Sequence, residues 1–403
     1  MTAGRHTWRA ELGGWLYDHR VAFVVGTRPE AIKLAPLANA MLRHGVWPRL
    51  ILTGQHPDLR PEEYGMPPLE RVALECGGLP DPHSYVGLVA RKVRAVAGDT
   101  RLMIVQGDTS SALGGALGAV QAGVPVAHVE AGLRSHDRLN PWPEEEFRIA
   151  IDRVSDLLFA PTELNAANLR REAQTGHVHV TGNTGIDALL ELIQRLPAAA
   201  KCGAKRRLLI TCHRRESWGE GLQAIASCMI AIGRRPDVEL SVVLHSNPRV
   251  ADEMRRLLGS SPNLTLHSPC GHLEMLRKMQ DSDLILSDSG GMQEEAPALG
   301  VPLLVLRDRT ERPEGVASGN VIMAGRDSKR ILDIVERLLG DPSLLTSMSA
   351  PALPYGDGHA AERIAAIIEG WLIGDLKVSE PRSPSSRSAT APAAPSLRYA
   401  SRM

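Results

Sequence analysis

Three acidic residues of the chain lie where carboxylates can transfer protons. Asp108 and Glu130 each come shortly after an apolar run with the length of a buried strand, so we expect both at the carboxyl edge of a parallel sheet. Partial burial there would raise their pKa values toward the range of general acids and bases. Glu144 begins a predicted helix after two prolines and shares one helix face with Arg148. The alternatives are loop capping by Asp108 and Glu130, and a surface ion pair between Glu144 and Arg148.

A glycine turn with two cations follows the first apolar run. In GTRPEAIK (Gly26–Lys33), Arg28 and Lys33 stand five residues apart at the start of a predicted helix. Backbone N–H groups and the positive end of the helix favour an anion there, and the two side chains would supplement them. The alternative is a tight turn between strand and helix that carries surface cations.

A second glycine turn lies late in the chain, within SDSGGMQEE (287–295). Gly290 and Gly291 would let backbone N–H groups approach a phosphate, and Ser289 adds a hydroxyl donor. Glu295, in the following helix, can accept hydrogen bonds from ribose hydroxyls. The alternative is a turn whose acidic residues complement the helix dipole. Because both turns lack Gly-x-Gly-x-x-Gly, no nicotinamide cofactor is expected.

One histidine, His213, directly follows a predicted strand over 207–211 in the string CHRRES. Its imidazole would lie at the same edge of a sheet as the turns above, where it could donate to a pyrophosphate oxygen or to a departing oxygen. A structural hydrogen-bond donor at the end of a strand is the alternative interpretation.

The elements that must position these residues alternate between strand and helix. Apolar runs over 21–25, 49–52, 102–106, 124–129 and 157–160 are separated by segments with helical spacing, as over 30–42. After ELIQRLPAAAKCGAK (191–205) the alternation restarts, with predicted strands over 207–211, 238–245, 264–269, 284–291 and 302–308. The pattern predicts an α/β protein with two parallel, doubly wound sheets, and a ligand site between the carboxyl ends of their strands.

Composition excludes several classes of protein. The chain has 403 residues with 43% hydrophobic and 23% charged residues, which is the ordinary globular mix. Lys+Arg and Asp+Glu both number 46, so no net basic field would attract nucleic acid or a membrane surface. The 5 cysteines have no disulfide or zinc-ligand spacing. With no apolar run suited to a signal peptide or a bilayer span, these features favour a cytoplasmic protein without a structural metal.

Taken together, the motifs resemble one family. The strings GTRPEAIKLAPL, TGQH, QGDTSSA, HVEAGLRS, PWPEEEFR, TGNTGIDAL, HRRES, SDSGGMQEEAPALGVP and TERPEGV are similar, in this order, to those of the bacterial non-hydrolysing UDP-N-acetylglucosamine 2-epimerases. The resemblance covers roughly residues 20–373. Phe147 and Arg309 depart from the usual family pattern, as does the string that follows GQH.

The resemblance implies a GT-B architecture of two Rossmann-like domains with the active site in the cleft between them. The implied domains cover 21–195 and 205–358, with an N-terminal extension over 1–20, a helix at about 359–373 that packs back on the first domain, and a disordered tail over 379–403. It also implies a homodimer that needs no cofactor.

The implied activity is reversible epimerisation at C2 of UDP-N-acetylglucosamine, giving UDP-N-acetylmannosamine through elimination and re-addition of UDP. The residues that match the family's catalytic positions are Asp108, Glu130, Glu144 and His213. Those that match its substrate contacts are Arg28, Lys33, Arg148, Ser289, Gly290, Gly291, Glu295 and Arg312. A GT-B glycosyltransferase and a non-catalytic UDP-sugar-binding regulator are the alternative functions, since fold alone does not decide between them.

The tail yields a first prediction. Residues 379–403 are rich in Ser, Pro, Ala and Arg and lack the apolar content needed for a core. Deleting Ser379–Met403 should therefore leave turnover of UDP-N-acetylglucosamine within a few-fold of the parent. A larger loss in a variant whose thermal unfolding is unchanged would show that the tail covers the cleft or an interface.

Overall fold

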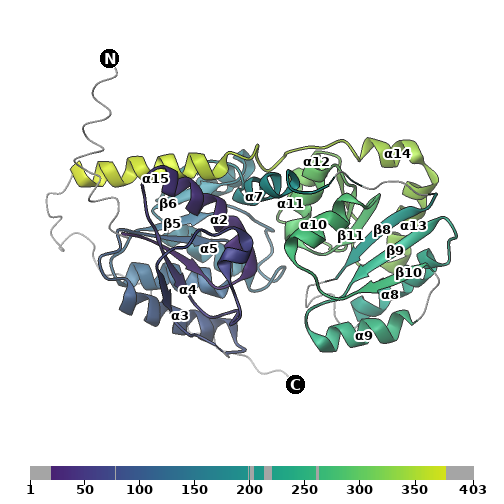
Figure 1. Cartoon of the computed structure of the whole chain (residues 1–403), viewed down its shortest axis with the longest axis horizontal. Helices are drawn as coiled ribbons and strands as arrows, with labels where there is room; N and C mark the ends of the chain where they lie inside the picture. Colours follow the sequence, from purple (N-terminus) through teal and green to yellow (C-terminus); the bar gives the residue numbers. More distant parts are fainter. Residues whose placement is uncertain are drawn as a thin grey trace, which may run out of the picture.

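A computed structural model describes residues 20–77, 79–197, 199, 204–212, 220–259 and 263–377. Within this part, the strands form two parallel sheets, each flanked by helices on both faces (Figure 1). The strand order is β3-β2-β1-β4-β5-β6-β7 in the 7-stranded first sheet and β10-β9-β8-β11-β12-β13 in the 6-stranded second sheet. The α/β prediction is confirmed.

The elements of the first half run from β1 to α7. Its strands are β1 (Val21–Val25), β2 (Arg49–Leu52), β3 (Arg71–Ala73), β4 (Leu102–Gln106), β5 (Val126–Val129), β6 (Leu157–Ala160) and β7 (His177–Val180). Its helices are α2 (Arg28–Arg43), η1 (Pro61–Tyr64), α3 (Pro82–Val96), α4 (Ser110–Gln121), α5 (Glu144–Val154), α6 (Glu163–Arg171) and α7 (Thr184–Ile193).

The second half repeats the pattern. Its strands are β8 (Arg206–Thr211), β9 (Val238–Val243), β10 (Leu264–His267), β11 (Leu284–Ser287), β12 (Leu303–Val305) and β13 (Val321–Met323). Its helices are α8 (Glu220–Gly233), α9 (Pro248–Leu258), α10 (His272–Gln280), α11 (Gly290–Leu299), α12 (Pro313–Ala317), α13 (Ser328–Gly340), α14 (Pro342–Ser347) and the final helix α15 (Ala360–Lys377).

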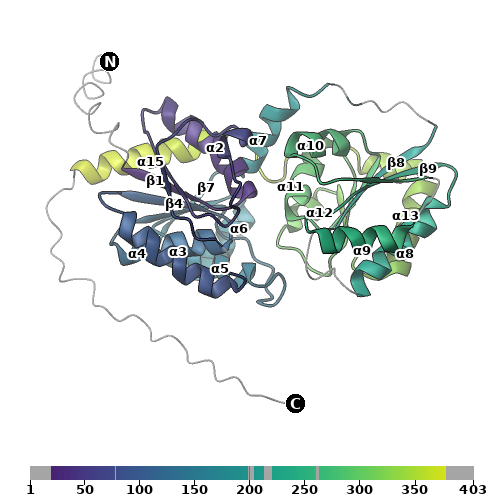
Figure 2. The same ribbon diagram turned by 60° about the horizontal axis from the view of Figure 1, so that its bottom comes forward.

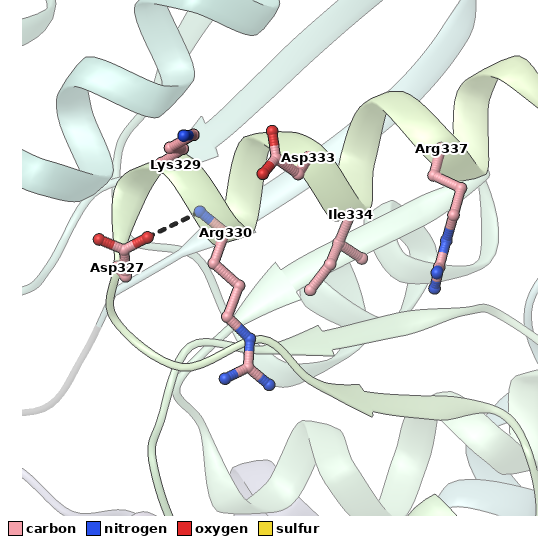
Figure 3. A pocket seen from close by; sticks show the side chains of 6 residues that line it. All are labelled: Asp327, Lys329, Arg330, Asp333, Ile334 and Arg337. Carbon is pink, nitrogen blue, oxygen red and sulfur yellow. Dashed lines mark hydrogen bonds between the residues drawn. The ribbon is translucent and has the colours of Figure 1, made fainter.

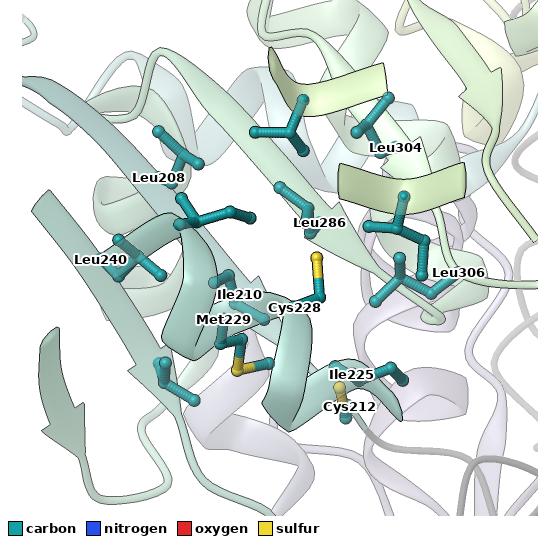
Figure 4. Close-up of a cluster of buried hydrophobic side chains, with 14 of the residues drawn as sticks. Leu208, Ile210, Cys212, Ile225, Cys228, Met229, Leu240, Leu286, Leu304 and Leu306 are labelled. Atoms are coloured by element: carbon teal, nitrogen blue, oxygen red, sulfur yellow. The ribbon is translucent and has the colours of Figure 1, made fainter. Parts of the chain in front are cut away.

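Each sheet is buried on both faces because its central strands place apolar residues on both sides. In β1, Phe23 and its alternate neighbours pack toward α2 and α15, whereas Ala22 and Val24 pack toward α3 and α4. The second sheet follows the same rule. Leu208 and Ile210 of β8 join the cluster beneath α8 and α13 (Figure 4), and Leu209 faces α11.

Three strands were missed by the sequence analysis. β3, β7 and β13 lie at sheet edges and are short and partly exposed. Polar residues interrupt the apolar pattern of β3 and β7, and β13 is apolar but only 3 residues long. Helix α2 also begins two residues earlier than predicted. Thr27 caps it, and Glu30 accepts hydrogen bonds from the backbone N–H groups of Gly26 (2.6 Å) and Thr27 (2.7 Å). The domain limits given above stay predictions.

The final helix α15 returns to the first half of the chain and lies along α2 (Figures 1 and 2). Its buried residues Ile364, Ala365 and Ile368 complete the apolar cluster on that face of the first sheet. Polar contacts add to this packing at the end of α2. His44 Nδ1 lies 2.7 Å from Glu369 Oε2, and His44 Nε2 lies 2.8 Å from Glu362 Oε1.

These contacts give the attachment of α15 a pH dependence. Although burial alone would lower it, the pKa of His44 is raised because Glu369 and Glu362 stabilise the imidazolium. A raised folded-state pKa stabilises the protein fully below the pKa of unfolded histidine, and that stabilisation disappears as pH rises through the folded value. The free energy of unfolding of the parent should therefore exceed that of His44→Gln by more at pH 6 than at pH 9, in urea titrations. If the parent and His44→Gln differed in free energy of unfolding by the same amount at both pH values, the predicted contribution of these ion pairs would be wrong.

Candidate active site

The sequence motifs flank the two points where strand order reverses. In the first sheet this point lies between β1 and β4, and in the second it lies between β8 and β11. The turn with Arg28 follows β1, and Asp108 follows β4. The turn with Ser289 follows β11. Ligands of open α/β sheets bind at such positions, outside the carboxyl ends of the strands.

Four charged side chains from both halves of the chain meet in one cluster, which we call the central cluster: Lys33, Glu130, Glu294 and Arg312. Lys33 Nζ lies 2.7 Å from Glu130 Oε2 and 2.9 Å from Glu294 Oε2. Arg312 lies opposite, with Nη2 3.1 Å from Glu130 Oε1 and Nε 2.6 Å from Glu294 Oε1. Each carboxylate therefore contacts both cations, and the contacts join residues that are far apart in the sequence.

The central cluster shifts the pKa values of its members. Burial raises the pKa of Glu130; the charges of Lys33 and Arg312 oppose this shift, and the charge of Glu294 adds to it. For Glu294 the balance is reversed. Its burial is outweighed by the charges and hydrogen bonds of Lys33 and Arg312, so its pKa is lowered. Glu130 is therefore the carboxylate of this pair that accepts a proton more readily.

Glu130 is held in an unusual backbone conformation. Its φ angle is 73°, in the left-handed region that residues other than glycine rarely adopt. The backbone N–H groups of Glu130 and Ala131 both donate to the carbonyl oxygen of Phe159, at 3.1 and 3.0 Å, which fixes the bend directly after β5. Gln106 at the end of β4 donates to the Glu130 side chain. Such backbone strain is concentrated at functional sites in proteins.

Asp108 belongs to a neighbouring group of charges. Arg148 Nε donates to Asp108 Oδ2 at 3.0 Å, and Arg148 Nη1 donates to Glu145 Oε2 at 2.9 Å. Glu145 also accepts the backbone N–H of Ser135, at 3.0 Å. The sequence placed Glu144 on the same helix face as Arg148, and the structure adds a contact between Arg148 and Glu145, one residue later. Glu144 lies half-buried at the first position of α5.

The turn after β11 lies against Arg312. A Cβ atom added to Gly290 would lie 2.9 Å from Arg312 Nη1, so a glycine is needed for the guanidinium to approach the start of α11. A Cβ atom added to Gly291 would lie 4.0 Å from Ser289 Oγ, which is an ordinary contact distance. Ser289 is the N-cap residue of α11, and its hydroxyl makes no capping hydrogen bond. Backbone N–H groups, one hydroxyl and one cation thus surround this helix end, which favours an anion.

Glu295 lies at the edge of this site, on α11. Its Oε1 atom lies 2.8 Å from His272 Nε2, at the start of α10. Beside His272 a groove of about 360 Å³ runs between the two halves of the chain. It is lined by residues of α2, η1, α7 and α10, including Ile32, Tyr64 and Leu273. The role of Glu295 as an acceptor for ribose hydroxyls stays a prediction.

Two of the predicted site residues, Arg28 and His213, are not placed with the others. Arg28 is exposed at the start of α2 and is not a member of the central cluster. His213 lies outside the described residues. The structure thus brings Lys33, Glu130 and Arg312 together, places Asp108 beside Arg148, and puts Gly290 beside Arg312. Ser289 and Gly291 are the neighbours of Gly290 in the same turn.

Several polar partners in the site were missed by the sequence analysis. Glu294 was noted only as part of an acidic helix turn, and Gln106 and Glu145 were given no role. Glu311 contacts Arg312 and also accepts from Arg307 Nη2 at 2.9 Å. Glu294 and Glu145 stand beside glutamates that were chosen. Helix spacing could have selected them, because Glu294 lies four residues after Gly290 and Glu145 lies three residues before Arg148.

Other features of the described residues do not point to a further site. A hollow on the outer side of α13 is lined by Asp327, Lys329, Arg330, Asp333, Ile334 and Arg337 (Figure 3), none of which the sequence predicted. No group of His, Cys, Asp and Glu in the described part of the chain could hold a metal ion. None of its helices is long and apolar enough to cross a bilayer.

Comparisons with known proteins agree with this geometry. The family model for UDP-N-acetylglucosamine 2-epimerase matches residues 41–369. The UDP-N-acetylglucosamine 2-epimerase of Yersinia pestis is 37% identical over 382 residues, covering 88% of this chain and 99% of that protein. The enzyme of the same name from Escherichia coli K12 is 37% identical over 373 residues, covering 86% and 97%.

A solved structure agrees with the sequence comparisons. The UDP-GlcNAc 2-epimerase of Neisseria meningitidis, bound to UDP-GlcNAc, has a TM-score of 0.80 and 33% identity, and the match covers 86% of this chain and 99% of that one. The predicted GT-B architecture is thereby confirmed. Since both the family model and these relatives match nearly all of the described residues, the chain belongs to the UDP-N-acetylglucosamine 2-epimerase family.

Proposed function

We propose that this chain epimerises UDP-N-acetylglucosamine at C2 to UDP-N-acetylmannosamine by eliminating UDP and adding it back. The observation that carries the proposal is the central cluster, where carboxylates and cations from both sheets meet. Two solved UDP-GlcNAc 2-epimerases that this chain resembles are bound to UDP-GlcNAc or to both UDP-GlcNAc and UDP. This supports the same substrate for this chain.

The chemistry accounts for the types of residue. C2 of the sugar has no adjacent carbonyl, so simple loss of its proton would leave an unstabilised carbanion. In the elimination, a carboxylate takes the C2 proton, the C1–O bond to UDP breaks, and a C1=C2 double bond forms in 2-acetamidoglucal. Re-addition forms the C1–O bond again while a carboxylic acid delivers a proton to the other face of C2.

We assign the proton transfers to Glu130, Asp108 and Glu144. Glu130 is the strongest candidate, because its pKa is raised mainly by burial and its backbone fixes its orientation. Arg148 would keep Asp108 oriented beside the sugar through their hydrogen bonds.

The departing UDP gains negative charge, and cations must stabilise it. Arg312 lies beside Gly290 and shares the partner Glu294 with Lys33, so we assign both cations to the diphosphate, together with Ser289, Gly290 and Gly291. We also assign Arg28, at the start of α2, to it. We also assign Arg148 and His213 to this step, and Glu295 to the ribose hydroxyls. The reaction exchanges one proton and one leaving group, so we propose that it needs no cofactor.

Two further expectations concern the cellular compartment and the oligomeric state. Cys76, Cys212, Cys228 and Cys270 are free thiols, which supports a reducing compartment such as the cytoplasm. The homodimer that the family resemblance implies stays a prediction.

A prediction follows for UDP. If Ser289 and Arg312 anchor the nucleotide, the variant with both Ser289→Ala and Arg312→Ala should bind UDP much more weakly, because one charged hydrogen bond contributes about 1.5–3 kcal/mol. Isothermal calorimetry with UDP alone measures this. Arg330→Ala, on the exposed surface of α13, is the control and should bind as the parent does. Affinity within threefold of the parent in the folded double variant would refute the assignment.

The proton transfers give another prediction. In D2O the product must carry deuterium at C2, detectable by NMR, because the returning proton comes from an exchangeable group. Asp108→Asn, Glu130→Gln and Glu144→Gln should each turn over about 10²–10⁴ times more slowly. Asp108→Asn and Glu144→Gln should still bind UDP nearly as well as the parent, since the carboxamide keeps the shape. Glu130→Gln should bind it at least as well, since Lys33 and Arg312 then face one carboxylate fewer.

Glu146→Gln is the matched control. Glu146 lies in the same helix turn as Glu144 but is exposed, so its amide variant should keep the parental rate. A product without deuterium, or near-parental rates in all three site variants, would rule out this mechanism and favour a glycosyltransferase that needs an acceptor.

A further inference from the structure

Glu294 is a buried carboxylate that the proposed mechanism does not use. It lies on α11, one turn after Gly290, and its side chain is only 3% exposed. It contacts Lys33 from α2 of the first half and Arg312 from its own half. A charge buried this deeply is unfavourable unless cations and hydrogen bonds compensate it, and both of its oxygens have such a partner.

A glycine beside Glu294 leaves space for its ion pair with Lys33. A Cβ atom added to Gly185, at the start of α7, would lie 3.2 Å from Lys33 Cε and 3.5 Å from Glu294 Oε2. A larger residue at 185 would press on the ion pair. The start of α7 therefore gives Lys33 room to reach across to Glu294.

The charges leave little free positive charge for a ligand. Within the central cluster, the two cations Lys33 and Arg312 are balanced by the two carboxylates of Glu130 and Glu294. Arg312 contacts a further carboxylate, Glu311. A diphosphate that binds Lys33 and Arg312 therefore competes with Glu294 for the positive charge of these two side chains.

We propose that Glu294 is a positioning residue that aligns Lys33 and Arg312 across the two halves and competes with the substrate diphosphate for them. This rests on the proposed function, because it takes those two cations as diphosphate contacts. A competing internal carboxylate keeps the cations in place before the ligand arrives, and it weakens the hold on UDP so that the nucleotide can leave and return.

Glu294 also acts on the candidate proton acceptor. Among the described residues, the charged groups that face Glu130 are Lys33 from α2, Arg312 from the segment before α12, and Glu294 from α11; Gln106 from β4 is neutral. Its negative charge disfavours ionisation of Glu130. Removing this charge should lower the pKa of Glu130, while Lys33 and Arg312 remain.

The test is Glu294→Gln, which keeps the hydrogen-bonding shape and removes the charge. UDP should bind roughly three- to tenfold more tightly, measured by calorimetry, since one competing charge is gone. The limb of the kcat/KM–pH profile that reports Glu130 should move to lower pH. A residue with a merely structural role would weaken UDP binding and leave the position of that limb unchanged.

Two further variants complete the design. Glu294→Asp keeps the charge on a shorter side chain, so UDP affinity should not rise above that of the parent. Asp333→Asn removes a carboxylate on the exposed surface of α13 and should change neither readout. Unchanged or weaker UDP binding in folded Glu294→Gln would overturn the proposal. Because the UDP titration needs no turnover, a parent that fails to deuterate C2 would overturn the proposed function alone.

Discussion

The site depends on buried ion pairs that neither half of the chain can complete alone. Lys33 and Glu130 come from the first half, and Glu294 and Arg312 come from the second. Burying one such charge without its partner costs several kcal/mol, so the ion pairs form only while the turns of both sheets stay in position. The parallel sheets hold the turns there, because these turns follow the ends of the central strands.

A second buried network, of hydrogen bonds and an ion pair, holds the strand that precedes the bend at Glu130. His128, on β5, lies between two acceptors, with Nδ1 2.7 Å from Asp152 Oδ1 and Nε2 2.9 Å from the carbonyl oxygen of Gly107. Asp152 in turn lies 2.7 Å from Arg134 Nη2. These contacts connect the residue before Asp108 to the strand before Glu130, so the two candidate carboxylates share one rigid support.

Central strands and glycine turns could be predicted from sequence because they depend on local patterns. The apolar run of β1 and the turn before Lys33 are examples. The edge strand β7 could not be predicted in this way, because it becomes a strand only through its pairing with β6, the single strand beside it. The partners of Glu130 were equally hidden. Lys33 is 97 residues away and Arg312 is 182, and no local pattern reports which distant charges will meet.

The return of α15 to the first half has a consequence for biosynthesis. Ile364, Ala365 and Ile368 cover one face of a sheet whose strands all lie before residue 181. A ribosome makes the chain from its N-terminus, so that apolar face is complete long before the helix that covers it exists. Part of the apolar face of the first sheet therefore stays exposed to solvent while the second half is translated. Newly made chains are most prone to aggregation during this interval.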